Sequence, residues 1–209
     1  MSRHPEQLGF DALLATAAQD NTARALEKET AHLPSDWTEA IAYHLWQIDC
    51  HHLAMLENDF DGAIAIRNDA YLLAKKLNDG APGILAGEDA PGCVLARKAA
   101  AEKGHVPLWG QDGVFELQAA GMAFRVEMNG MFGIGATAMP YLGFSVRAID
   151  LAKPFLSETG YRSFLGVSVA PETGMTTADF VCRVVELHVE NELKGQLLNI
   201  AEHYRERNR

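Results

Sequence analysis

The sequence predicts an α+β protein in which an N-terminal helical hairpin region precedes an antiparallel β-meander sheet, packed with a C-terminal helix. Three observations predict this fold class. Residues 37–77 carry apolar side chains at helical spacing with one short break, residues 114–128 alternate between apolar and polar side chains, and residues 176–193 return to helical spacing. Helices that precede a run of strands, with one more helix after it, are typical of an α+β arrangement.

A segment rich in glycine and proline, residues 78–83, separates two predicted domains. Residues 1–78 form the helical region, and residues 79–209 form an α+β domain with the antiparallel sheet. The 209 residues suffice for one large domain or two small ones, and either has enough length to bury a core.

The N-terminal region is expected to be helical throughout. Residues 5–33 predict two helical pieces with a break at Asp20–Asn21, and Ser35 is a plausible N-cap for a longer helix over 37–56. A second helix over 60–77 follows after a very short turn, so the two form an antiparallel hairpin. The inner stripe of the first hairpin helix is expected to hold Ile41, Leu45, Ile48, His52 and Met55.

The sheet is expected to start with strands 114–119 and 122–128 around a two-residue loop. That loop sets Phe115 opposite Val126, Leu117 opposite Phe124 and Glu116 opposite Arg125. Apolar side chains then share one face and an opposite-charge pair lies on the other, which supports this register.

The remaining elements are predicted from turn and strand signals in the sequence. Asn129–Gly130 predicts a type I′ turn into a third strand, because both central residues of that turn have positive φ. Further strands are expected over residues 144–149 and 164–169, and a short helix over 94–103 precedes the sheet.

Charge and composition limit the function classes. The net charge of −10 argues against nonspecific nucleic-acid binding, which rests on lysine and arginine. Without a signal peptide or an apolar run of 18 residues, the sequence predicts a cytoplasmic protein that does not insert in membranes. The three cysteines are isolated, so no disulfide framework is indicated.

The acidity is concentrated in the helical region, where residues 1–78 carry twelve acidic and six basic side chains. This pattern predicts a protein partner with a basic surface, or mimicry of nucleic acid. The alternative is that the charge only keeps the protein in solution. The candidate interaction surface consists of Asp36, Glu39, Asp59, Asp61 and Asp69.

A second candidate site is the loop of residues 157–163, which combines hydroxyl, carboxylate, phenol and guanidinium groups. Its arginine could bind an anion or a small ligand. The same residues also form an ordinary turn, with Arg162 free to pair with a sheet carboxylate. The candidate binding residues are Glu158, Tyr161, Arg162, His105 and Glu127.

No metal, no cofactor and no catalytic residue are predicted. His44 and His51 lie two helical turns apart, and His52 lies on another face, whereas metal ligands on a helix usually sit three or four residues apart. The glycines of residues 133–138 lack the third glycine of a dinucleotide fingerprint and run into Pro140.

Four phrases of the sequence carry a resemblance: PGILAG from Pro82, PLWG from Pro107, GMFGIG from Gly130 and PFLSETGYRSFLG from Pro154. Together they resemble a family of uncharacterised accessory proteins carried on bacterial plasmids and other mobile elements. The resemblance covers most of residues 40–200. It implies a cytoplasmic bacterial protein and favours interference with host defence, without naming a catalytic residue.

Two hypotheses follow. The first is a non-catalytic interaction or regulatory protein, an acidic inhibitor of a host nucleic-acid-acting defence system of the anti-restriction or anti-CRISPR type. The alternative is a small-molecule-binding protein or enzyme with its site around residues 157–163. A deep pocket that joins His105, Glu127 and Arg162 would favour the alternative.

Overall fold

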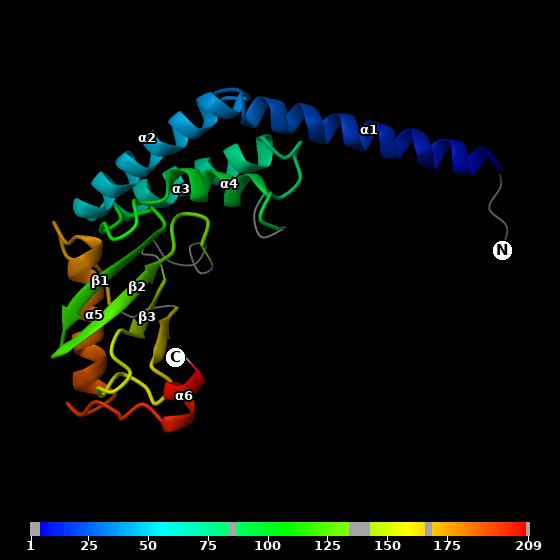
Figure 1. Ribbon diagram of the computed structural model, residues 1–209. Helices are drawn as coiled ribbons and strands as arrows, with labels where there is room; N and C mark the ends of the chain where they lie inside the picture. The colour runs from blue at the N-terminus through cyan, green and yellow to red at the C-terminus, as the bar shows by residue number, and fades with distance from the viewer. Residues whose placement is uncertain (1–4, 84–86, 134–142, 166–168, 208–209) are drawn as a thin grey trace.

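The computed structural model describes residues 5–83, 87–133, 143–165 and 169–207. It is an α+β structure in which a helical layer lies over one end of an antiparallel sheet, and a further helix packs behind that sheet (Figure 1). The elements in chain order are α1 (Pro5–Glu29), α2 (Trp37–Leu56), α3 (Phe60–Lys76), α4 (Pro91–Ala99), β1 (Gly113–Ala119), β2 (Met122–Met128), β3 (Phe144–Ala148), β4 (Tyr161–Phe164), α5 (Thr177–Asn191) and α6 (Glu202–Arg207).

Side-chain caps define the starts of the main helices. Asp36, and not the neighbouring serine, caps α2 by accepting hydrogen bonds from the backbone N–H groups of Thr38 and Glu39 at 2.8 and 3.2 Å. Asp59 caps α3 through Gly62. At α5 a reciprocal capping box joins Thr176 and Asp179. These local contacts explain why the helix boundaries follow the sequence signals closely.

The N-terminal helix differs from the expectation of two pieces. α1 runs unbroken past Asp20–Asn21 and projects away from the rest of the molecule (Figure 1). The segment that follows α1 is fixed to the end of α3, where Lys76 Nζ donates to the carbonyl oxygens of Thr30 and Leu33 at 2.9 and 2.6 Å. Because Asn and Asp are tolerated inside helices, a possible cap in the sequence did not become a boundary.

Within the described residues the sheet is a four-stranded antiparallel meander in the order β1-β2-β3-β4. The predicted pairing of β1 with β2 is confirmed, including Phe115 opposite Val126 and Glu116 opposite Arg125. Ala120 and Gly121 form the two-residue turn, and both have positive φ, at 49° and 76°. α5 packs against the apolar face, whereas the other face is largely exposed.

The predicted hairpin at Asn129–Gly130 is wrong. The chain leaves the sheet after Met128, Gly130 does not have a positive φ, and the next strand in the described part of the chain is β3. Gly130 instead donates its backbone N–H to Asp112 Oδ1. This contact with a residue 18 positions earlier overrides the local turn preference.

Gly130→Val is nevertheless expected to destabilise the fold, for a steric reason. A Cβ at this position would lie 2.6 Å from Asp112 Oδ1 and 2.7 Å from the Gly110 carbonyl oxygen. We expect a loss of about 1–3 kcal/mol in the free energy of unfolding, measured by urea denaturation. Gly121→Asn is the control, since its Cβ meets no atom within 4 Å and Asn tolerates positive φ. An unchanged Gly130→Val midpoint would contradict the close packing.

The other boundaries shift by a few residues. α4 begins at Pro91, which suits a first helical position, and ends at Ala99 rather than near 103. β4 covers residues 161–164, earlier than the predicted strand at 164–169, part of which lies outside the described residues.

Buried side chains form two clusters. One lies between the sheet, α5 and the end of α2, and includes Trp109, Phe115, Phe124 and Phe180. The other joins α2, α3 and α4 to Met131 and Phe132. Residues before and after position 78 thus share both clusters, and the division into domains 1–78 and 79–209 stays a prediction. In the described chain, no helix has the combination of length and apolarity that crossing a bilayer requires.

Candidate functional site

Four of the five acidic candidates lie at helix starts and are exposed. Asp36 and Glu39 begin α2, and Asp59 and Asp61 begin α3. Hydrogen bonds from the backbone N–H groups of Glu39 and Thr38 lower the pKa of Asp36, which keeps it ionised. Since the two helices are antiparallel neighbours and α2 has 20 residues, the two pairs lie about 30 Å apart along the helical layer.

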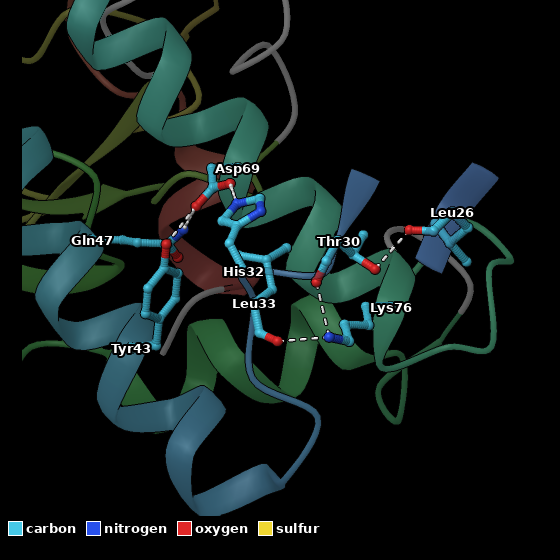
Figure 2. A network of polar contacts seen from close by, with 8 residues as sticks. All are labelled: Leu26, Thr30, His32, Leu33, Tyr43, Gln47, Asp69 and Lys76. Carbon is cyan, nitrogen blue, oxygen red and sulfur yellow. Dashed lines mark hydrogen bonds and ion pairs between the residues drawn. The ribbon is translucent and has the colours of Figure 1, made fainter. Parts of the chain in front are cut away.

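Asp69, the fifth candidate, has a different environment in the middle of α3. Its side chain is 25% exposed, and its oxygens accept hydrogen bonds from Tyr43 Oη at 2.8 Å and Gln47 Nε2 at 2.9 Å, and contact His32 Nε2 at 2.7 Å (Figure 2). Burial, followed by this carboxylate, raises the pKa of Tyr43 to about 12. Asp69 therefore joins α3 to α2 and to the segment after α1.

The two faces of α2 are unusual in composition. Its buried side includes the polar residues His44, Gln47 and His51, while Leu45, predicted to face inward, is 43% exposed. Trp46 and Leu53 are exposed as well, at 55% and 58%. The inner stripe predicted for this helix was thus wrong at Leu45, because apolar residues occur on every side of α2 and its periodicity is weak.

The histidines of α2 belong to the packing between the helical layer and the rest of the protein. His44 and His51 are buried, and burial lowers the pKa of each to about 4. His52 Nδ1 accepts the backbone N–H of Trp109 at 3.2 Å. Among the described residues, no three His, Cys, Asp or Glu side chains gather into a possible metal site. Most of residues 133–138, the glycine-rich stretch, lies outside the described residues.

The 157–163 loop uses its hydroxyl groups to cover an edge strand. Ser157 Oγ and Thr159 Oγ1 donate to the carbonyl oxygen of Tyr161 at 2.7 and 3.0 Å, and both accept its backbone N–H at 3.2 Å. Tyr161 is the first residue of β4, the last strand of the sheet. These contacts support the reading of the loop as a structural turn.

The five candidate binding residues of the second hypothesis are not gathered in one place. Tyr161 pairs with Arg147 on the exposed sheet face, where the guanidinium carbon lies 4.6 Å from the ring centroid. Arg162 pairs with Val146 on the opposite face. Glu127 lies two strands away on the exposed face, so it is not placed to pair with Arg162.

The other two candidates lie in turns. His105 Nδ1 is 3.7 Å from Glu102 before β1, and the carbonyl oxygen of Glu158 accepts the Ala201 backbone N–H at 2.9 Å. Arg162 lines an open hollow of about 350 Å³ with His188 and Glu192. None of His105, Glu127, Tyr161 or Glu158 lines that hollow.

The helical layer and the sheet together define an α+β protein with four exposed carboxylates at the starts of α2 and α3. Two proteins of Escherichia coli, each named Protein KlcB, are similar to this chain. One is 34% identical over 195 residues, which is 92% of this chain and 46% of that protein. The other is 34% identical over 169 residues, which is 80% of this chain and 35% of that protein.

The chain thus spans less than half the length of these relatives. The matches fit the resemblance to bacterial accessory proteins of plasmids, and the name KlcB states no activity. No family model and no solved structure matches the chain.

Proposed function

We propose that this chain is a non-catalytic interaction protein that presents carboxylates to a basic protein partner. Its biological role would be inhibition of a host defence system that acts on nucleic acid, of the anti-restriction or anti-CRISPR type. The similarity to Protein KlcB supports a bacterial accessory role but does not by itself indicate this activity.

One observation carries the proposal, namely the exposed carboxylates spread along the α2–α3 hairpin. Asp36 and Glu39 lie at one end of it, Asp59 and Asp61 at the other, and Asp49 lies between them on an exposed part of α2. α2 itself contains no lysine or arginine. α3 ends in Lys75 and Lys76, so the excess of carboxylates is greatest on α2. Such an excess of carboxylates attracts a basic surface and accelerates association with it.

Charge reversal tests this proposal. We expect Asp59→Lys with Asp61→Lys to slow association with the partner and to abolish protection of incoming DNA in a host that carries restriction or CRISPR interference. The measurement is the transformation or plaque-forming efficiency with and without the gene. Because contacts between exposed charges are screened, binding should also weaken as the salt concentration rises above physiological values.

The control reverses the same number of charges elsewhere. Glu186→Lys with Glu190→Lys changes two exposed carboxylates on α5 and should retain protection. Equal loss in both double variants would attribute the effect to net charge alone. Loss of protection in a folded Arg162→Ala protein, with the Asp59 and Asp61 reversal inactive, would reject the acidic-interaction proposal in favour of a site in the sheet domain.

A further inference from the structure

The exposed face of α2 carries the kind of side chains that usually lie in an interface. Ala42, Leu45, Trp46 and Leu53 are exposed, and their spacing of three, four, seven or eight residues places them along one side of the helix. We call these four residues the α2 stripe. Exposed apolar side chains along one side of a helix that include tryptophan are typical of docking surfaces, where tryptophan often carries much of the binding energy.

The tryptophan of the α2 stripe, Trp46, is held in place by the ring of Tyr43. Its ring centroid lies 5.2 Å from that of Tyr43, at an interplanar angle of 45°. The Tyr43 hydroxyl donates to Asp69, which Gln47 and His32 also contact (Figure 2). A side chain that is already ordered loses less conformational entropy when a partner binds. The Asp69 network thus prepares Trp46 as an anchor.

Charge around the α2 stripe specifies the partner. Glu39 is exposed beside Ala42, Asp49 is exposed within the stripe one helical turn from Leu45, Trp46 and Leu53, and Glu57 is exposed at the end of the helix. A second copy of this chain on the same face would bring these carboxylates against one another, since a symmetric dimer places the same patch on both sides. An anionic membrane surface would repel them as well. An apolar surface with flanking lysine or arginine fits both the stripe and its rim.

We propose that the α2 stripe is the docking site for an amphipathic helix of another protein. That helix has an apolar face flanked by lysine and arginine. This inference rests on the proposed function for the basic character of the partner, and it adds the docking position and the form of the docking segment. Leu45, Trp46 and Leu53 contact the apolar face of that helix, and Glu39, Asp49 and Glu57 pair with its lysine and arginine side chains.

A cross-linking experiment in cells tests where the partner docks and which kind of segment binds there. Trp46→p-benzoylphenylalanine, expressed in the bacterial host and irradiated, is expected to capture a segment of another protein with helical apolar spacing and several lysine or arginine residues. The same substitution at Val114, which is 41% exposed on the sheet, is the control. Adducts with a second copy of this chain, with lipid or with an acidic segment would overturn the proposal, as would adducts no stronger than at Val114.

A binding assay tests the chemistry with defined probes. Two labelled 18-residue helical peptides share one leucine face and differ in their flanks, lysine in one and glutamate in the other. By fluorescence anisotropy, the lysine-flanked peptide is expected to bind at least tenfold more tightly. The double variant Trp46→Ala with Leu53→Ala should bind the lysine-flanked peptide at least tenfold more weakly. The control variant Val114→Ala with Ile149→Ala, which changes two other exposed positions, should change this affinity less than twofold.

The outcomes separate this inference from the proposed function. If lysine-flanked binding is insensitive to Trp46→Ala with Leu53→Ala but is lost on Asp59→Lys with Asp61→Lys, the docking position is wrong and the acidic interaction stands. If both peptides bind equally and only the Trp46 and Leu53 variant loses them, the requirement for a basic partner is wrong. Binding of neither peptide overturns the present inference, while the DNA-protection assay still decides the proposed function.

Discussion

Trp109→Ala is expected to lower the free energy of unfolding by about 3–5 kcal/mol, because it removes a large buried side chain from the contact between the helical layer and the sheet. Trp109 is fully buried, and its indole Nε1 donates to the Met175 carbonyl oxygen at 2.8 Å. Its ring lies edge-on to Phe180 with 5.3 Å between centroids. The substitution leaves both a cavity and an unpaired carbonyl oxygen.

Urea denaturation of two further variants separates these contributions. Trp109→Phe keeps an aromatic ring and loses the Nε1 hydrogen bond, so its loss should be intermediate. Trp37→Ala removes a tryptophan that is 39% exposed and should cost about 1 kcal/mol or less. If Trp109→Ala unfolded at the same urea concentration as the wild type, the packing described for the two layers would be incorrect.

The second large effect that we expect is a fall in the free energy of unfolding when the pH is lowered from 7 to 5. In the folded protein the pKa values of His44 and His51 lie at about 4, below the ordinary value of 6.5, chiefly because both rings are buried. Below pH 6.5 the unfolded chain binds protons that the folded chain does not, so stability falls as the pH falls toward 4 and levels off below it. The loss between pH 7 and pH 5 should be on the order of 2 kcal/mol for each histidine.

The comparison that isolates this effect is between the wild type and His51→Leu. Leucine cannot be protonated, so the variant should lose about half of the histidine-dependent fall in stability between pH 7 and pH 5. Carboxylates titrate in both proteins and cancel in the difference. Protein with His105→Leu, an exposed position, serves as the control. Identical pH slopes for the wild type and His51→Leu would show that the ring is not held neutral by burial.

The sequence predicted those parts of the fold that depend on neighbouring residues. The β1–β2 pairing followed from alternation around Ala120–Gly121, and the α2–α3 hairpin followed from apolar side chains at helical spacing with one short break. Gly130 was misread because its environment depends on Asp112 and Gly110, which no local pattern reveals. The inner face of α2 was misread because His44 and His51, rather than Leu45, are buried.

The candidate site was less predictable than the fold, because it too depends on contacts between residues far apart in the sequence. Asp69 has the sequence context of an exposed helix carboxylate, yet its partners His32, Tyr43 and Gln47 lie 22 to 37 residues away. The exposure of Trp46 likewise follows only from the packing of the whole layer. A weakly amphipathic helix with tryptophan and no basic residue was the available signal for a docking face.

The hydroxyl groups around Tyr161 have a consequence for how the edge of the sheet meets other molecules. An edge strand with free N–H and C=O groups can pair with a strand of another molecule, and repeated pairing builds fibrils. At Tyr161 both groups are already bonded to Ser157 and Thr159. An incoming strand would have to displace two side chains before it gained a hydrogen bond there. The loop thus acts as a barrier to strand-by-strand aggregation at this edge of the sheet.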